Sequence, residues 1–297
     1  MYFNENTYIY FDGKFVKADE AKVNLYLQTL HYGYGVFEGI RSYSTNSGTK
    51  IFKAEEHYRR LQQSCSLMNI PFDYSTKELE DITYEVLSKN NFSDAYIRPL
   101  VLCSPNMSLT KAQHSMLLIA AWEWNSYLGN KLLDIKISSF CRPHPRSIKV
   151  EAKACGHYVN SILAVNEAKE NGYDEALLLD HEGWLAEGPG ANLFFEKDGH
   201  LYTPQTGNLL PGITRATVFE ICSQLDIVYE EGQYLPADLY NADAAFYCGT
   251  GAEIVGINSV DGKILGKEWN ETNSAHIQKR YLQLVREMDV HKKLKTA

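Results

Sequence analysis

The alternation of apolar and polar residues at the start of the chain predicts an antiparallel β-hairpin. Residues 7–11 and 14–17 each alternate with a period of two, and Asp12-Gly13 between them is typical of a two-residue hairpin turn. The same pattern, or a short continuous apolar run, recurs later in the chain. Further strands are therefore expected at 95–102, 115–122, 134–139 and 176–180.

Apolar residues spaced three or four positions apart predict several helices between these strands. One helix is expected over residues 54–70, and a second should begin at Ser75 because Ser75 and Glu78 have the spacing of a capping box. A third should run from Tyr158 to Asn171 and end at Gly172. Its predicted buried face consists of Ile162, Val165 and Ala168.

The segment 31–41 contains three glycines among aromatic residues and is interpreted as a glycine-kinked strand. Glycine spacing alone is weak evidence for a phosphate-binding loop, since the strand and helix that flank a dinucleotide-binding loop are not evident here.

Composition narrows the class of protein. A chain of 297 residues with 44% hydrophobic and 22% charged residues can bury a large core, and its net charge of −8 argues against nucleic-acid binding. We see no run of about 18 apolar residues and no basic segment leading into an apolar one. The six cysteines are scattered without zinc-ligand spacing, so no metal is expected. We therefore expect a soluble, cytoplasmic protein without a membrane partner.

The chain is expected to form two domains. Residues 1–122 form a smaller N-terminal domain, residues 123–133 a linker in which the periodicity breaks down, and residues 134–297 a larger C-terminal domain. Small-molecule sites often lie between domains, which makes the aromatic residues of the linker candidates for a binding site.

Lys153 is the main candidate for chemistry. It lies among small residues shortly before Tyr158 and an apolar helix. A cramped, partly apolar environment disfavours the ammonium form, which lowers the pKa of a lysine and frees its amine to attack a carbonyl. The alternative is an ordinary surface lysine at the start of a helix.

The motifs that follow Lys153 favour the chemical interpretation. They occur in the order 187–194 (EGPGANLF), 210–215 (LPGITR) and 248–254 (CGTGAEI). Together they resemble the fold-type IV aminotransferases, and with His31-Tyr32-Gly33 and Phe37-Glu38-Gly39 they look most like branched-chain amino acid aminotransferases. The resemblance extends from about residue 8 to residue 288. It implies an α+β fold whose C-terminal domain, which would carry Lys153, has a β-barrel-like core.

The resemblance implies pyridoxal 5'-phosphate as the cofactor, with Lys153 as the catalytic residue that forms a Schiff base with it. Glu187 would keep the pyridine nitrogen protonated, a role that also suits its residue type. Tyr158 would bond the phenolic oxygen. The expected cofactor-binding residues are Arg60, Lys153, Tyr158, Glu187, Asn192, Ile213, Thr214 and Thr250, of which Arg60, the amides of Ile213 and Thr214, and Thr250 would hold the phosphate.

The resemblance also implies a substrate site. Tyr96 and the Thr250 and Gly251 amides would bind the α-carboxylate, and Arg98 the distal carboxylate of glutamate. The expected substrate-binding residues are Tyr32, Phe37, Tyr96, Arg98, Trp124, Tyr127, Thr250 and Gly251, with Tyr32 reaching across a homodimer interface. Packing under a loop remains an alternative for Trp124. Arg98 could instead be an edge-strand arginine paired with an acidic neighbour, while Arg59 is interpreted as a surface residue.

The expected activity is transamination of leucine, isoleucine and valine with 2-oxoglutarate. Alternatives with the same cofactor residues are a D-amino acid or (R)-amine transaminase and an aminodeoxychorismate lyase, and a non-catalytic binding protein is a further one. Four motif positions carry residues that differ from the usual ones of the family, namely His157, Pro189, Ala191 and Gly251. Gly251 lies at the expected carboxylate contact and bears on substrate breadth.

Overall fold

The fold was analysed in a computed structural model that describes residues 2–124, 128–129 and 131–287. The chain folds into two compact units, each assembled from separate segments. Unit 1 comprises Met1–Ser42, Ile51–Asn125 and Pro143–Asn160, and unit 2 comprises Tyr43–Lys50, Ser126–Arg142 and Ser161–Ala297. This division is interleaved along the chain, whereas the division expected from the sequence was sequential. Lys153 belongs to unit 1.

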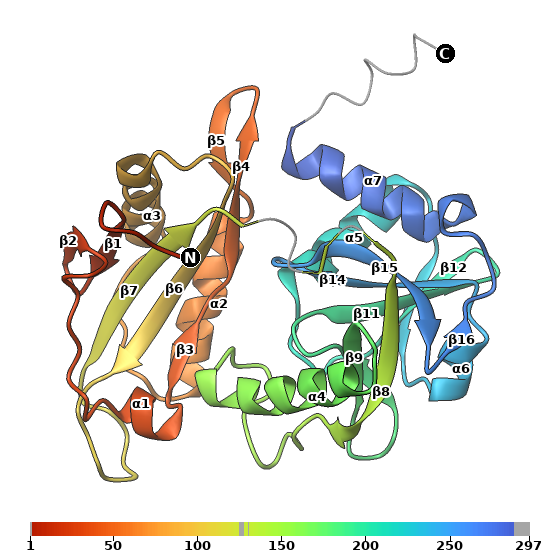
Figure 1. The fold of residues 1–297 in the computed structure, drawn as a ribbon, viewed down its shortest axis with the longest axis horizontal. Helices are drawn as coiled ribbons and strands as arrows, with labels where there is room; N and C mark the ends of the chain where they lie inside the picture. Colours follow the sequence, from red (N-terminus) through yellow and green to blue (C-terminus); the bar gives the residue numbers. More distant parts are fainter. Residues whose placement is uncertain (1, 125–127, 130, 288–297) are drawn as a thin grey trace. The chain divides into compact units, whose positions relative to one another are not determined.

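Unit 1 contains most of an antiparallel sheet whose strand order is β2-β1-β7-β6-β4-β5, with β3 paired to β6 (Figure 1). Residues 43–50, which include the end of β4 and most of β5, are assigned to unit 2. The strands are β1 (Tyr8–Phe11), β2 (Lys14–Lys17), β3 (Gly35–Phe37), β4 (Ile40–Thr45), β5 (Gly48–Ile51), β6 (Ala95–Cys103) and β7 (Ser115–Trp122). The helices are α1 (Gln28–Tyr32), α2 (Ala54–Leu67), α3 (Thr76–Asn90) and the short 3-10 helix η1 (Cys155–His157). Helices α2 and α3 pack on each other and against the sheet.

Local sequence signals account for two boundaries in unit 1. Asp12 and Gly13 have φ values of +46° and +89°, the backbone conformation that a two-residue hairpin turn requires. The Ser75 hydroxyl accepts a hydrogen bond from the Glu78 amide at 3.2 Å, and the Ser75 amide donates to the Glu78 carboxylate at 2.8 Å. The predicted hairpin and capping box are therefore confirmed.

The prediction of one glycine-kinked strand over residues 31–41 was wrong. His31 and Tyr32 end helix α1, and Gly33 terminates it with φ +65°, a left-handed conformation that glycine adopts without strain. The chain then forms β3 and, after Glu38 and Gly39, β4. The glycines thus separate a helix from two strands instead of bending a single strand.

Unit 2 contains a closed β-barrel. The strands are β8 (Leu133–Cys141), β9 (Glu175–Leu179), β10 (Leu185–Glu187), β11 (Asn192–Lys197), β12 (His200–Pro204), β13 (Tyr229–Gly232), β14 (Ala244–Gly249), β15 (Glu253–Val260) and β16 (Lys263–Ile264). The order β10-β9-β8-β15-β14-β11 closes on itself through pairing of β10 with β11, while β12, β13 and β16 extend it. The expected barrel-like core and α+β class are confirmed.

Helices cover the barrel of unit 2. They are α4 (Tyr158–Glu170), which begins in unit 1, α5 (Ile213–Gln224), α6 (Pro236–Tyr240), the 3-10 helix η2 (Trp269–Glu271) and α7 (Asn273–Val285). Helices α5 and α7 lie side by side against β14 and β15 (Figure 1). Within the described part of the chain, no helix combines the length and apolar character needed to cross a membrane.

The buried face predicted for α4 was right for Ala168 and wrong for Ile162, and Val165 is half-buried. The helix buries Ser161, Ala164 and Ala168, whereas Ile162 is 58% exposed. Ala164 and Ala168 cluster with Ala176 and Leu178 of β9. Small side chains allow a helix to approach a barrel strand closely, and the larger apolar residues of α4 are left on its outer side.

Glu175 generates a prediction about stability and pH. Burial raises the pKa of this carboxyl to about 7, although the Ala176 amide and the charge of Lys169 favour its ionised form. Tyr247, the other titratable group facing Glu175, is itself held neutral by burial, which raises its pKa. Because the pKa is higher in the folded than in the unfolded protein, Glu175 contributes stability below about pH 4.5 that is lost as the pH rises through 7.

Replacement of Glu175 by Gln should therefore reduce the loss of stability between pH 5 and pH 9 by roughly 3 kcal/mol, measured by urea unfolding. Glu182→Gln, in the exposed turn after β9, is the matched control and should leave the pH profile unchanged. Equal pH profiles for wild type and Glu175→Gln would contradict this account of Glu175.

Candidate active site

Unit 1 holds Lys153 next to aromatic side chains. The Lys153 Nζ donates a hydrogen bond to the Tyr158 hydroxyl at 2.8 Å and lies 5.2 Å from the centre of the Phe37 ring. The backbone is fixed as well, because the Phe37 amide donates to the Lys153 carbonyl and the Lys153 amide to the Ser64 hydroxyl. The partially buried amine thus has a phenol as its hydrogen-bond partner, which suits a lysine that must react.

Arg60 lies in a buried ionic cluster of unit 1. Its Nε and Nη2 donate to the two carboxylate oxygens of Glu38 at 2.7 and 2.9 Å, and His57 Nδ1 lies 2.7 Å from Glu38 Oε2. Burial opposes ionisation of Glu38, but Arg60 and His57 outweigh it and hold the pKa of Glu38 well below its usual value. By contrast, Arg59 pairs with Glu55 on the exposed side of the helix, as expected.

The expected substrate-binding residues of β6 lie together in unit 1. Arg98 Nη2 donates to the Tyr96 hydroxyl at 3.2 Å, and the Arg98 guanidinium lies 4.6 Å from the centre of the Phe37 ring. Trp124 packs edge-on against Tyr96 with ring centres 4.9 Å apart. The Arg98 Nε is buried and makes no hydrogen bond to any described residue. An unsatisfied buried N–H of this kind suits a ligand that carries a carboxylate.

One expected substrate residue, Tyr32, makes its hydrogen bond elsewhere in the chain. Tyr32 is 44% exposed, and its hydroxyl donates to the carbonyl of Met107 in the same chain at 3.0 Å. Tyr127 lies outside the described residues.

Glu187 is the centre of a second buried cluster, in unit 2. The pairing of β10 with β11 places Glu187 opposite Asn192, and the Asn192 amide donates both to Glu187 Oε2 at 3.1 Å and to the Leu210 carbonyl at 3.0 Å. The Leu210 amide donates to Glu187 Oε1 at 3.1 Å. Arg142 Nε lies 3.0 Å from the same oxygen, an ion pair without the alignment of a hydrogen bond. The carboxylate is thus paired with a positive charge and fixed in orientation.

Backbone amides in unit 2 offer an anion site. Helix α5 begins at Ile213 after Gly212, which makes no side-chain cap. The first amides of a helix have no partner within the helix, and its dipole favours negative charge there. The hydroxyl group of Thr214 hydrogen-bonds Tyr281. Thr250 and Gly251 form the turn between β14 and β15.

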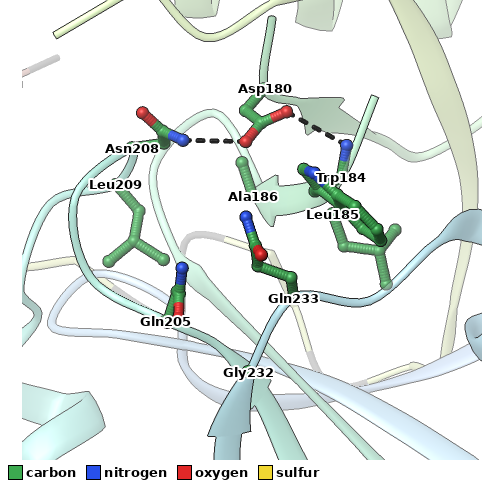
Figure 2. A pocket seen from close by; sticks show the side chains of 9 residues that line it. All are labelled: Asp180, Trp184, Leu185, Ala186, Gln205, Asn208, Leu209, Gly232 and Gln233. Carbon is green, nitrogen blue, oxygen red and sulfur yellow. Dashed lines mark hydrogen bonds between the residues drawn. The ribbon is translucent and has the colours of Figure 1, made fainter. Parts of the chain in front are cut away.

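A small cavity is lined by residues of β10, next to Glu187, and by residues of the loop that precedes Leu210. It is lined by residues that include Asp180, Trp184 and Asn208, and Asp180 accepts hydrogen bonds from the Trp184 amide and the Asn208 side chain (Figure 2). Its volume of about 20 Å³ is enough for about one water molecule. The cavity is too small for a cofactor. The hydrogen bond between Asn208 and Asp180 beside it helps to hold the loop that precedes Leu210.

Three residues of these clusters, namely Glu38, His57 and Arg142, were not expected from the sequence. His57 and Arg60 share one face of α2, so their spacing of three could have indicated a pair. Glu38 lies within a motif that was noted, but its partners follow much later in the chain. Arg142 directly follows β8, and its sequence context contains no signal for its contact with Glu187.

Gly212 leaves the space that Asn192 occupies. A Cβ atom on Gly212 would lie 2.0 Å from Asn192 Oδ1, whereas a Cβ on Gly190 would meet nothing within 4 Å. Gly212→Ala should therefore displace the Asn192 amide and lower the free energy of unfolding by roughly 1–3 kcal/mol. Gly190→Ala, the matched control, should change it by less than about 0.5 kcal/mol. Equal stability of the two variants in urea titrations would contradict the close contact.

Comparisons with known proteins identify the family. Residues 35–260 match the model of the family described as Amino-transferase class IV. The branched-chain-amino-acid aminotransferase of Pseudomonas aeruginosa is 40% identical over 93% of this chain and 92% of its own. The crystal structure of the Escherichia coli branched-chain amino acid aminotransferase superposes with a TM-score of 0.92, at 37% identity and 97% coverage of both chains.

A further structure, the branched-chain amino acid aminotransferase of Thermobaculum terrenum in its PLP (holo) form, superposes with a TM-score of 0.89 at 33% identity over 96% of both chains. The family match spans most of the chain, and the curated relative and both structures agree with it. The chain therefore belongs to the class IV aminotransferases, among the branched-chain-amino-acid aminotransferases.

Proposed function

We propose that this protein is a pyridoxal phosphate-dependent aminotransferase that transfers the amino group of leucine, isoleucine or valine to 2-oxoglutarate, giving branched 2-oxo acids and L-glutamate. The main supporting observation is the partly buried Lys153 amine, which donates to a tyrosine hydroxyl and is flanked by the Phe37 ring. The relatives support the substrate class through their names, and one similar structure is the PLP form of such an enzyme.

The donor set fits this cofactor. A reactive amine and a phenol lie together in unit 1, and a buried carboxylate fixed by Arg142 and Asn192 lies in unit 2. We propose that each set of residues takes part in binding the cofactor. Arg60, the amides of Ile213 and Thr214, and Thr250 would bind its phosphate. When bound, pyridoxal phosphate supplies an aldehyde for amines and a ring that withdraws electrons from the substrate Cα.

Lys153, Tyr158 and Glu187 would have separate roles in the proton transfers. The Lys153 Nζ would act as general base, taking the proton from the substrate Cα and delivering it to C4′ of the cofactor. The Tyr158 hydroxyl, 2.8 Å from that nitrogen, orients it. Glu187 would hold a proton on the ring nitrogen, and the contacts with Arg142 and Asn192 fix the orientation of its carboxylate.

The substrate site would combine an apolar wall with two carboxylate sites. Tyr96 and the amides of Thr250 and Gly251 would bind the α-carboxylate, and the Arg98 guanidinium the distal carboxylate of glutamate. An unsatisfied Arg98 Nε beside aromatic rings supports this assignment, because a leucine side chain can pack on the rings while the guanidinium pairs with an acid. Phe37, Trp124 and Tyr127 would line the wall, joined by Tyr32 of a second subunit.

We further propose that the protein assembles as a homodimer or larger homo-oligomer. Large apolar side chains are exposed along α4 and along the segment that leads into α1, which favours contact with another subunit. These side chains are Leu25, Tyr26, Leu30, Val159, Ile162 and Leu163. The cytoplasmic location remains a prediction.

A panel of amino donors tests the proposed activity. With 2-oxoglutarate as acceptor, L-leucine, L-isoleucine and L-valine should have kcat/KM values at least about 100-fold above that of D-alanine, since their carboxylate and side chain would meet matching sites. L-glutamate formation is the measurement. Comparable rates with D-alanine would favour a D-amino acid transaminase, and release of pyruvate from aminodeoxychorismate without an acceptor would favour a lyase.

A further inference from the structure

The buried cluster formed by Glu38, His57 and Arg60 contains two groups that the proposed reaction does not use. Glu38 is fully buried, His57 is 1% exposed and Arg60 is 9% exposed. Burying charge is expensive unless it is paired and hydrogen-bonded. A protein therefore needs a reason to keep a carboxylate and an imidazole here in addition to the arginine.

The arrangement fixes the arginine on one side. Glu38 accepts hydrogen bonds from Nε and Nη2, which is a bidentate pair along one edge of the guanidinium. A guanidinium has five N–H groups in one plane, so a carboxylate on this edge determines where the remaining N–H groups point. A second anion can approach Arg60 only from that remaining side.

His57 holds the carboxylate in turn. Its Nδ1 lies 2.7 Å from Glu38 Oε2, and its own backbone is anchored in α2. Burial lowers the pKa of His57 even though the bond to Glu38 opposes this, so the imidazole is neutral at pH 7 and donates through Nδ1–H. His57 thus adds a hydrogen bond without adding a second positive charge.

The cluster adjoins the reactive lysine within unit 1. Glu38 directly follows Phe37, whose amide donates to the Lys153 carbonyl, and its own amide donates to the Pro99 carbonyl of β6. Helix α2 carries His57, Arg60 and Ser64 at spacings of three and four, and Ser64 accepts from the Lys153 amide. The same helix face therefore holds both the arginine cluster and the backbone of Lys153.

We infer that Glu38 and His57 are positioning residues that aim the Arg60 guanidinium at a phosphate monoester, the 5'-phosphate of the cofactor. This inference rests on the proposed function, because it takes Arg60 to be a phosphate ligand. It assigns to Glu38 and His57 the discrimination between a phosphorylated and an unphosphorylated cofactor. A purely structural role would leave that discrimination unchanged.

The test compares the dissociation constants of pyridoxal and pyridoxal phosphate, measured by spectral titration of the full-length protein. The ratio is the dissociation constant of pyridoxal divided by that of pyridoxal phosphate. Glu38→Gln should lower this ratio roughly tenfold or more, because a misoriented Arg60 loses charge-assisted hydrogen bonds to the phosphate, which pyridoxal lacks. Glu55→Gln removes the partner of the exposed Arg59 on the same helix and is the matched control. Its ratio should equal that of the wild type.

A second pair of variants addresses His57 and covers the case that Glu38→Gln fails to fold. His57→Asn keeps a hydrogen-bond donor near the position of Nδ1, so its ratio should stay close to that of the wild type. His57→Leu removes the donor and should lower the ratio severalfold. Unchanged ratios in Glu38→Gln and His57→Leu, while Arg60→Gln lowers the ratio, would overturn this inference alone. An unchanged ratio in Arg60→Gln would refute the phosphate role of Arg60, and no binding of pyridoxal phosphate to the wild type would refute the proposed function.

Discussion

Pairing of buried charge is the constraint on which the candidate clusters of unit 1 and unit 2 each depend. In unit 1 the carboxylate of Glu38 is paired with Arg60, and in unit 2 the carboxylate of Glu187 is paired with Arg142. Each acid also accepts a hydrogen bond from a neutral side chain, namely His57 or Asn192. An isolated ion at such a position would be costly, whereas a paired and hydrogen-bonded one can be held in one orientation. A fixed orientation suits the cofactor-binding role proposed for these clusters.

Lys153 departs from this pattern. Its described partners are the Tyr158 hydroxyl and the aromatic ring of Phe37, with no acid at ion-pair distance among the described residues. The fold thus pairs the buried carboxylates of Glu38 and Glu187 with arginines, whereas the Lys153 amine bonds a tyrosine hydroxyl.

The parts of the fold that the sequence predicted are those set by local chemistry. The Asp12-Gly13 turn and the Ser75–Glu78 capping box depend on residues close in the chain, and both were confirmed. The predicted face of α4 was right at Ala168 but wrong at Ile162, because small residues pack on the barrel strand β9 and hydrophobicity alone does not reveal this.

Of the candidate site, the resemblance supplied the residue list, and its roles stay predictions. The structure adds contacts that bring distant segments together, such as Arg142 with Glu187 and Glu38 with Arg60. Each of these pairs joins two segments through sheet or helix packing. No local pattern around Arg142 or Glu38 specifies its partner, so sequence reasoning could not find them.

The most direct test of the central claim is to identify the lysine that binds the cofactor. The purified protein with pyridoxal phosphate would be reduced with borohydride, digested and analysed by mass spectrometry. The phosphopyridoxyl group should be attached to Nζ of Lys153, and Lys153→Ala should carry none and be inactive. Labelling of another lysine, or activity that survives in Lys153→Ala, would contradict the account.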